Sequence, residues 1–233
     1  MKIVICGGGI IGLSCAYFLA KKNVSCIIIE QEEIACGASG KAGGFLAKTW
    51  CKSNGCNELA LLSYDLHMEL AKNFTEVDYR NVDTYSAFID KIRSPITRKS
   101  SEYLKWIDGP ATNRSLLETV DTTSQELPEK AKDVIIERWK CSQLREVAYS
   151  ACSNLESSEI VAEQACFLPL SSDGVPIIGK IDAIEGAYIA TGHSCWGILN
   201  STGTGYAIAD LITTGKCDLL DMEPFNPNRL SKN

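Results

Sequence analysis

The feature that most constrains this chain is a glycine-rich turn directly after a short apolar run at its start. Residues 2–6 read Lys-Ile-Val-Ile-Cys, a run typical of a parallel strand that is covered on both faces. Gly7, Gly9 and Gly12 follow at once with the spacing G-x-G-x-x-G. In that position the pattern is typical of an α/β fold with a Rossmann-type dinucleotide site.

The residues after the turn complete a βαβ unit. A helix is predicted over 11–22, and Asn23 lies where a helix C-terminus tolerates a left-handed backbone. A second apolar strand is predicted over 24–29, and it ends at Glu30. A carboxylate at that strand tip accepts hydrogen bonds from ribose hydroxyls, and its charge disfavours the 2′-phosphate of NADP. The alternative is a glycine-rich turn beside a solvated Glu30.

Each position of the turn has a physical task. Gly7 permits the tight exit from the strand, Gly9 lets the backbone approach a pyrophosphate, and Gly12 lets the helix lie close to the strand. The unpaired amides of the first helical residues, Ile10 and Ile11, favour phosphate groups together with the helix dipole.

A second glycine-rich segment covers residues 36–46. Such a loop can wrap the other side of a dinucleotide through its backbone amides. A nicotinamide-binding domain does not need this loop after its second strand, so an NAD-dependent dehydrogenase is disfavoured. The alternative is a flexible surface loop. The candidate residues for cofactor binding here are Ser39, Gly40, Lys41, Gly43 and Gly44.

A third motif lies near the C-terminus. A short strand is predicted over 186–191, followed by the segment Gly-His-Ser-Cys-Trp-Gly-Ile at 192–198. A helix is then predicted from about Ser201 or Thr202 to Thr214, and Gly215 closes it at a C-cap position.

Together the three motifs resemble the glycine oxidase and D-amino-acid oxidase family of FAD-dependent oxidoreductases. The resemblance covers about residues 1–125 and 155–225 and implies FAD as the cofactor. It implies that Gly7, Gly9, Ile10, Ile11, Gly12 and Glu30 hold the ADP half. The glycine-rich loop would serve the middle of the cofactor. Gly192, His193, Trp196, Gly197 and Ile198 would lie at the flavin.

The resemblance also implies an activity and an architecture. The expected reaction is oxidation of a small amine or amino acid by hydride transfer to the flavin, and no catalytic residue can be assigned. Trp196 could exclude water from the flavin, and His193 could instead bond only its own loop. The expected fold is α/β, with a Rossmann-type FAD-binding domain containing a parallel sheet (1–75 and 166–225) and a reduced α+β substrate domain (76–165).

The family pattern breaks after residue 124. Polar helices are predicted over 129–141 and 142–155, and a strand over 161–168, where the family would continue a substrate-binding sheet and add a strand to the first domain. We therefore expect a shortened form that has an unpaired sheet edge or an unfilled face and binds FAD weakly or not at all. The alternative function is that of a catalytically impaired interaction or assembly protein.

Composition excludes several classes. The net charge is −6 and no basic stripe recurs, so nucleic acid is a poor candidate partner. No apolar run reaches the length of a signal peptide or a membrane span, which predicts a soluble, cytoplasmic protein. The eleven cysteines lack zinc-ligand spacing, so we expect most of the thiols to be buried and no metal site. Protein partners cannot be predicted from the sequence.

Overall fold

The computed structural model describes residues 2–52, 55–74, 79–82 and 134–232. The chain divides into two compact units, one formed by Met1–Tyr79 with Cys166–Asn233 and the other by Arg80–Ala165. The assignment of a cofactor domain and a substrate domain to the predicted boundaries stays a prediction.

The chain begins with the predicted βαβ unit. Strand β1 (Ile3–Cys6) leads through the glycine turn into helix α1 (Ile10–Lys21), and strand β2 (Cys26–Ile29) follows. β1 and β2 pair in parallel, with Ile3 opposite Cys26. Asn23 has a φ of 59°, the left-handed conformation expected just after the helix. The prediction of an α/β fold with a parallel strand pair is confirmed.

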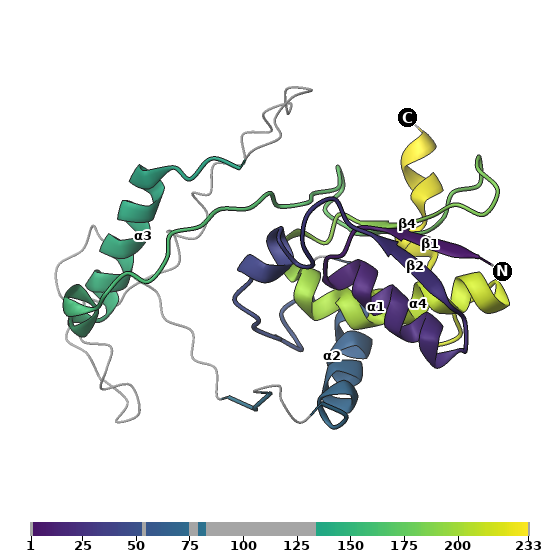
Figure 1. The fold of residues 1–233 in the computed structure, drawn as a ribbon, viewed down its shortest axis with the longest axis horizontal. Helices are drawn as coiled ribbons and strands as arrows, with labels where there is room; N and C mark the ends of the chain where they lie inside the picture. The colour runs from purple at the N-terminus through teal and green to yellow at the C-terminus, as the bar shows by residue number, and fades with distance from the viewer. Residues whose placement is uncertain (1, 53–54, 75–78, 83–133, 233) are drawn as a thin grey trace. The chain divides into compact units, whose positions relative to one another are not determined.

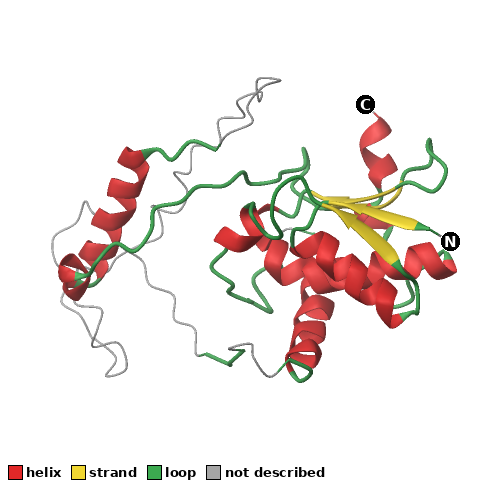
Figure 2. Ribbon diagram, viewed as in Figure 1, coloured by secondary structure: helices red, strands yellow, loops and turns green. Residues whose placement is uncertain are grey.

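Helices α1 and α4 (Gly197–Thr214) pack side by side beneath the strands (Figures 1 and 2). Phe18 of α1 packs on Tyr206 of α4, with 5.7 Å between ring centroids. Four residues further along the chain from each of them, Lys22 forms an ion pair with Asp210 at 2.6 Å. The two helices therefore run in the same direction. α4 begins four residues earlier than the predicted Ser201, and Gly215 closes it in the left-handed conformation, as expected.

A second strand pair lies on the same side of these helices. β3 (Ile177–Lys180) pairs antiparallel with β4 (Tyr188–Thr191), which lies beside β1 in Figure 1. β4 was predicted and β3 was not. Among the described residues β1 pairs only with β2, and β4 pairs only with β3. β1 and β4 therefore each have an unpaired edge, which is one of the outcomes expected from the break in the family pattern after residue 124.

The faces of β1 and β2 differ from the expectation. β1 was expected to be covered on both faces, but the side chains of β1 and β2 alternate between the helix side and solvent. Val4, Ile27 and Ile29 are 54%, 62% and 56% exposed. The expectation is wrong because α1 and α4 cover one face, and no other described element covers the opposite one.

Helix α2 (Asn57–Ala71) completes the first unit, packing antiparallel against α4. Its His67 ring lies 2.9 Å from the carbonyl oxygen of Ile198, and the Ser63 hydroxyl lies 3.0 Å from the amide of Gly203. Leu59 is fully buried in the resulting core. The contact of His67 with Ile198 thus holds the first turn of α4 against α2.

In the part of the second unit that the structure describes, residues 80–82 and 134–165, one long helix replaces the two that were predicted. α3 spans Arg138–Ala151 and continues through the predicted break at residue 141, with a 3₁₀ turn at Ser153–Ser157. Residues 134–137 are not helical, consistent with the stiffness of their β-branched side chains. The strand predicted over 161–168 is also absent, since no described strand lies beside it to pair with, and Val161 is 92% exposed.

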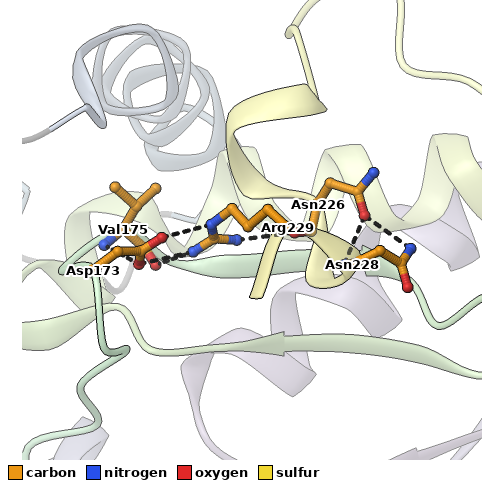
Figure 3. Close-up of polar contacts among 5 residues, drawn as sticks. All are labelled: Asp173, Val175, Asn226, Asn228 and Arg229. Atoms are coloured by element: carbon orange, nitrogen blue, oxygen red, sulfur yellow. Dashed lines mark hydrogen bonds and ion pairs between the residues drawn. The ribbon is translucent and has the colours of Figure 1, made fainter. Parts of the chain in front are cut away.

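An ion pair between Arg229 and Asp173 connects the C-terminal segment to the loop before β3 (Figure 3). Nε of Arg229 lies 2.7 Å from Oδ2 of Asp173, and its Nη2 lies 3.0 Å from Oδ1. The same Nη2 donates to the carbonyl oxygen of Val175 at 2.7 Å. The guanidinium holds the pKa of the Asp173 carboxyl well below its usual range.

We expect Arg229→Ala to lower the free energy of unfolding by about 1.5 kcal/mol, because it removes charge-assisted hydrogen bonds from a partly buried guanidinium. Lys216→Ala is the matched control, since its ion pair with Asp218 is exposed on both sides and should contribute much less to stability. Urea unfolding of the two variants measures both values. Equal losses would contradict the anchoring role of Arg229.

No helix in the described ranges combines the length and apolar character needed to cross a membrane.

Candidate cofactor site

In the turn between β1 and α1, the backbone of Gly12 lies against the backbone of Gly7. A Cβ atom added at Gly12 would lie 2.1 Å from the carbonyl oxygen of Gly7, which no side chain can occupy. Gly7 has a φ of 110°, and its amide donates to the carbonyl oxygen of Ile29 at 2.8 Å. Both glycines therefore have the roles that the sequence predicts for the turn.

Glu30 lies against this turn. Its Oε2 accepts a hydrogen bond from the amide of Gly8 at 2.6 Å, and its Oε1 accepts from Gln31 at 2.7 Å and Glu32 at 3.2 Å. These amides, that of Gly8 foremost, hold the pKa of the Glu30 carboxyl below its usual value. The carboxylate is solvent-accessible and each oxygen keeps acceptor capacity, so it can also receive two hydroxyl donors.

The glycine-rich loop reaches the N-terminus of α1. Its 3₁₀ turn η1 (Ala38–Lys41) places the Ser39 hydroxyl 2.9 Å from the amide of Ile10, whose proton it accepts. A Cβ atom on Gly9 would lie 3.2 Å from the same hydroxyl. An oxygen acceptor thus already lies at the first amide of the helix, where a phosphate oxygen would bind.

The remaining loop residues lie at an open surface. Gly44 has a φ of 69°, and nothing lies within 4 Å of a Cβ atom added at Gly43 or Gly44. Gly40 is fixed by its amide, which donates to the carbonyl oxygen of Ala35 at 2.9 Å. Lys41 ends η1 and is partly exposed.

A cavity of about 770 Å³ begins at the turn and continues between the edges of β1 and β4 that no described strand pairs with. Successive residues of both strands line it, which is expected at a strand edge rather than at a face, where alternate residues appear. α1 and α4 contribute an apolar floor. The lining includes Gly7, Gly9, Ile10, Ile11, Gly12, Ser39 and residues 188–191.

The third motif connects β4 to α4. Gly192 has a φ of 77°, Trp196 ends the 3₁₀ turn η4 (Ser194–Trp196), and Gly197 begins α4, with Ile198 next. The structure places the His193 ring inside the core, 3% exposed, with Nε2 lying 3.0 Å from Oγ1 of Thr204. Burial lowers the pKa of His193 to about 4, so the ring is neutral at pH 7.

One aromatic residue near these motifs was not predicted. Trp50 lies 6.5 Å from Trp196 and 5.3 Å from Phe45, measured between ring centroids. It therefore connects the end of the glycine-rich loop to the segment before α4. The only sequence signal is its position four residues after the glycine-rich loop, and tryptophan there is equally compatible with a core residue.

The arrangement fits the ADP half of a dinucleotide. The turn glycines leave room that a Cβ atom would fill, the Ser39 oxygen lies at the first α1 amide, and the Glu30 carboxylate borders the turn. No cluster of three or more potential metal ligands occurs within the described ranges.

One family model and several known proteins resemble this chain. The model of the DAO family, described as FAD dependent oxidoreductase, matches residues 2–121 and 110–211. A putative oxidoreductase of Schizosaccharomyces pombe is 37% identical over 103 residues, which are 42% of this chain and 26% of that protein. Glycine oxidase of Geobacillus kaustophilus is 36% identical over 76 residues, or 33% of this chain and 20% of that protein.

A solved structure extends the likeness to the whole fold. L-proline dehydrogenase from P. horikoshii superimposes with a TM-score of 0.73 at 14% identity, covering 99% of this chain and 97% of that one. Identity this low is informative about the fold alone. The curated relatives, by contrast, are matched over about a quarter of their length or less.

Proposed function

Because the chain belongs to the DAO family of FAD-dependent oxidoreductases, we propose that it binds FAD with the ADP half at the β1–α1 turn and oxidises a small amine or amino acid. The observation that carries the proposal is the convergence on that turn of the Glu30 carboxylate and the Ser39 hydroxyl, at 2.6 and 2.9 Å from the amides of Gly8 and Ile10.

Different described residues would bind different parts of the cofactor. Glu30 binds the ribose hydroxyls. The amide of Ile11 and the glycine-rich loop bind the pyrophosphate with the Ser39 hydroxyl, which the Ile10 amide positions. The 192–198 segment lies at the ring system. When bound, FAD would accept the hydride that a neutral amine loses from its α-carbon on becoming an iminium ion.

The chain itself contributes positioning and electrostatics. The N-terminus of α4 stabilises the negative charge that develops on the ring system, since its first amides and its dipole point to that end. Trp196 excludes water from the reacting atoms. No general base is required if the amine arrives neutral, so positioning supplies most of the catalysis.

We expect binding to be weak and reversible, since the cavity at the turn continues into the opening between β1 and β4. The absorption spectrum of the purified protein tests this, and one tightly held flavin per chain would contradict it. Oxygen consumption with secondary amines and D-amino acids then tests the reaction. Absence of turnover with saturating FAD would exclude this substrate class with oxygen as acceptor.

Glu30→Gln should raise the dissociation constants of both ADP and FAD about tenfold, because a charged acceptor for the ribose hydroxyls becomes neutral. The amide oxygen of glutamine can still accept from Gly8, which preserves the turn. Glu33→Gln, a like change in the same exposed loop, is the control and should leave both constants unchanged. Calorimetric titration gives the values, and unchanged ADP affinity in Glu30→Gln would place the ribose elsewhere.

A second candidate is a catalytically impaired interaction or assembly protein. Two observations favour it, since uncovered strands are sites of association. Within the described ranges β1 and β4 each have an unpaired edge, and the side chains of Val4, Ile27 and Ile29 are exposed. Catalytic turnover separates the two candidates: the oxidoreductase consumes oxygen or another acceptor with substrate, and the interaction protein does not.

A further inference from the structure

Three aromatic side chains form a cluster at the surface of the first unit, Phe45, Trp50 and Trp196. Trp50 meets Trp196 edge-on, with 89° between the ring planes, and lies tilted by 55° against Phe45. Phe45 is 44% exposed and Trp50 is 52% exposed, although both are among the most apolar side chains of the chain. The cluster thus presents aromatic surface to solvent at one place.

The exposure of Trp50 is fixed by its neighbours in the sequence. Ala47 and Cys51 are 5% and 0% exposed, so the segment is held in the core on both sides of the indole. Lys48 adds an ion pair with Asp65 at 2.6 Å on helix α2. Trp50 is therefore displayed by a well-anchored segment.

The cluster also joins two segments of the proposed cofactor site. Phe45 directly follows the glycines at the end of the glycine-rich loop, and Trp196 precedes the first residue of α4. Trp50 contacts both of these residues and is the only described ring that links them. A planar, largely apolar ring held between these segments would meet the cluster.

We propose that Phe45, Trp50 and Trp196 form an aromatic wall for the ring system of FAD, with Trp50 connecting its two sides. This inference rests on the proposed function. Stacking or edge contact with aromatic side chains stabilises a planar heterocycle and removes exposed apolar surface from water. Trp50 contacts the ring end of the cofactor in this arrangement, whereas Glu30 contacts the ADP end.

The test separates the two ends by titrating each variant with FAD and with ADP, which lacks the ring. Trp50→Ala should weaken FAD binding about tenfold and change ADP binding by less than about twofold. Trp50→Phe, which keeps an aromatic ring, should restore most of the FAD affinity. Trp139→Ala is the matched control, since Trp139 is 58% exposed and lies outside the cluster.

The outcomes are distinct. Unchanged ADP affinity in Trp50→Ala also shows that the variant is folded. If FAD binds the unmodified chain and Trp50→Ala equally well, the wall is overturned and the proposed function stands. If the unmodified chain binds ADP but FAD no more tightly, the ring has no site and the wall is overturned. If neither binds, the proposed function falls with it.

Discussion

Gly205→Val is expected to lower the free energy of unfolding by about 4 kcal/mol, the largest effect of any single change considered for this chain. A Cβ atom at Gly205 would lie 2.5 Å from the carbonyl carbon of Ser14 and 2.7 Å from its oxygen. These are backbone atoms of α1, so no rotamer change relieves the overlap. The two helices would have to separate.

Separation is costly because α1 and α4 form the floor beneath both strand pairs. Leu19 and Ala209 are fully buried in the core that contains their contact. Valine has a higher helix propensity than the glycine that it replaces, but that gain is small beside the steric overlap.

Gly43→Val provides the control, because nothing lies within 4 Å of a Cβ atom there. Urea unfolding followed by circular dichroism gives the stability of both variants. Equal midpoints for the two would mean that the α1–α4 backbone contact is not as close as the structure has it.

The βαβ unit could be predicted because its determinants are local. The glycine spacing, the flanking apolar runs and Glu30 all lie within 30 residues, and each acts through backbone geometry that a sequence pattern encodes. The left-handed residues Asn23 and Gly215 at the ends of α1 and α4 were predictable for the same reason.

The errors arise where pairing partners decide the structure. The apolar run at 161–168 is a strand by composition, but no described strand lies beside it, and an isolated strand gains no ladder of hydrogen bonds. β3 was missed because its four residues include Gly179, and its partner β4 stabilises it through tertiary contact.

In the candidate site, too, local features could be predicted and contacts between distant residues could not. Glu30 and the turn glycines could be brought together by a local motif, whereas the contact of Trp50 with Trp196 joins residues far apart in the sequence. The interior position of His193 was also unpredictable, because the packing of α4 decides whether its ring faces Thr204 or a cofactor.

The protein should lose stability as the pH falls from 7 to 4, and His193 should account for about 3 kcal/mol of that loss. Burial lowers the pKa of this histidine from 6.5 to about 4 in the folded protein. Between these values the unfolded chain binds the proton and the folded chain does not. Protonation therefore favours unfolding, and the contribution of His193 is fully present above pH 6.5.

His193→Asn isolates this contribution. The variant should be less stable than the original at pH 7, because the smaller side chain leaves a cavity beside Thr204. Its stability should nevertheless fall less steeply between pH 6.5 and 4, because the titrating ring is gone. The difference between the two slopes, obtained from urea unfolding at several pH values, measures the effect of His193 alone.

Other groups that titrate in this range are shared by both proteins. Burial also lowers the pKa of His67, and the lowered pKa of Glu30 adds a loss of stability near its own unfolded value. The contributions of His67 and Glu30 are the same in the original protein and in His193→Asn, so they cancel when the two slopes are subtracted. Parallel stability curves for the two proteins would show that the His193 ring is protonated inside the fold at little cost, and hence that it is accessible to water or to a negatively charged group.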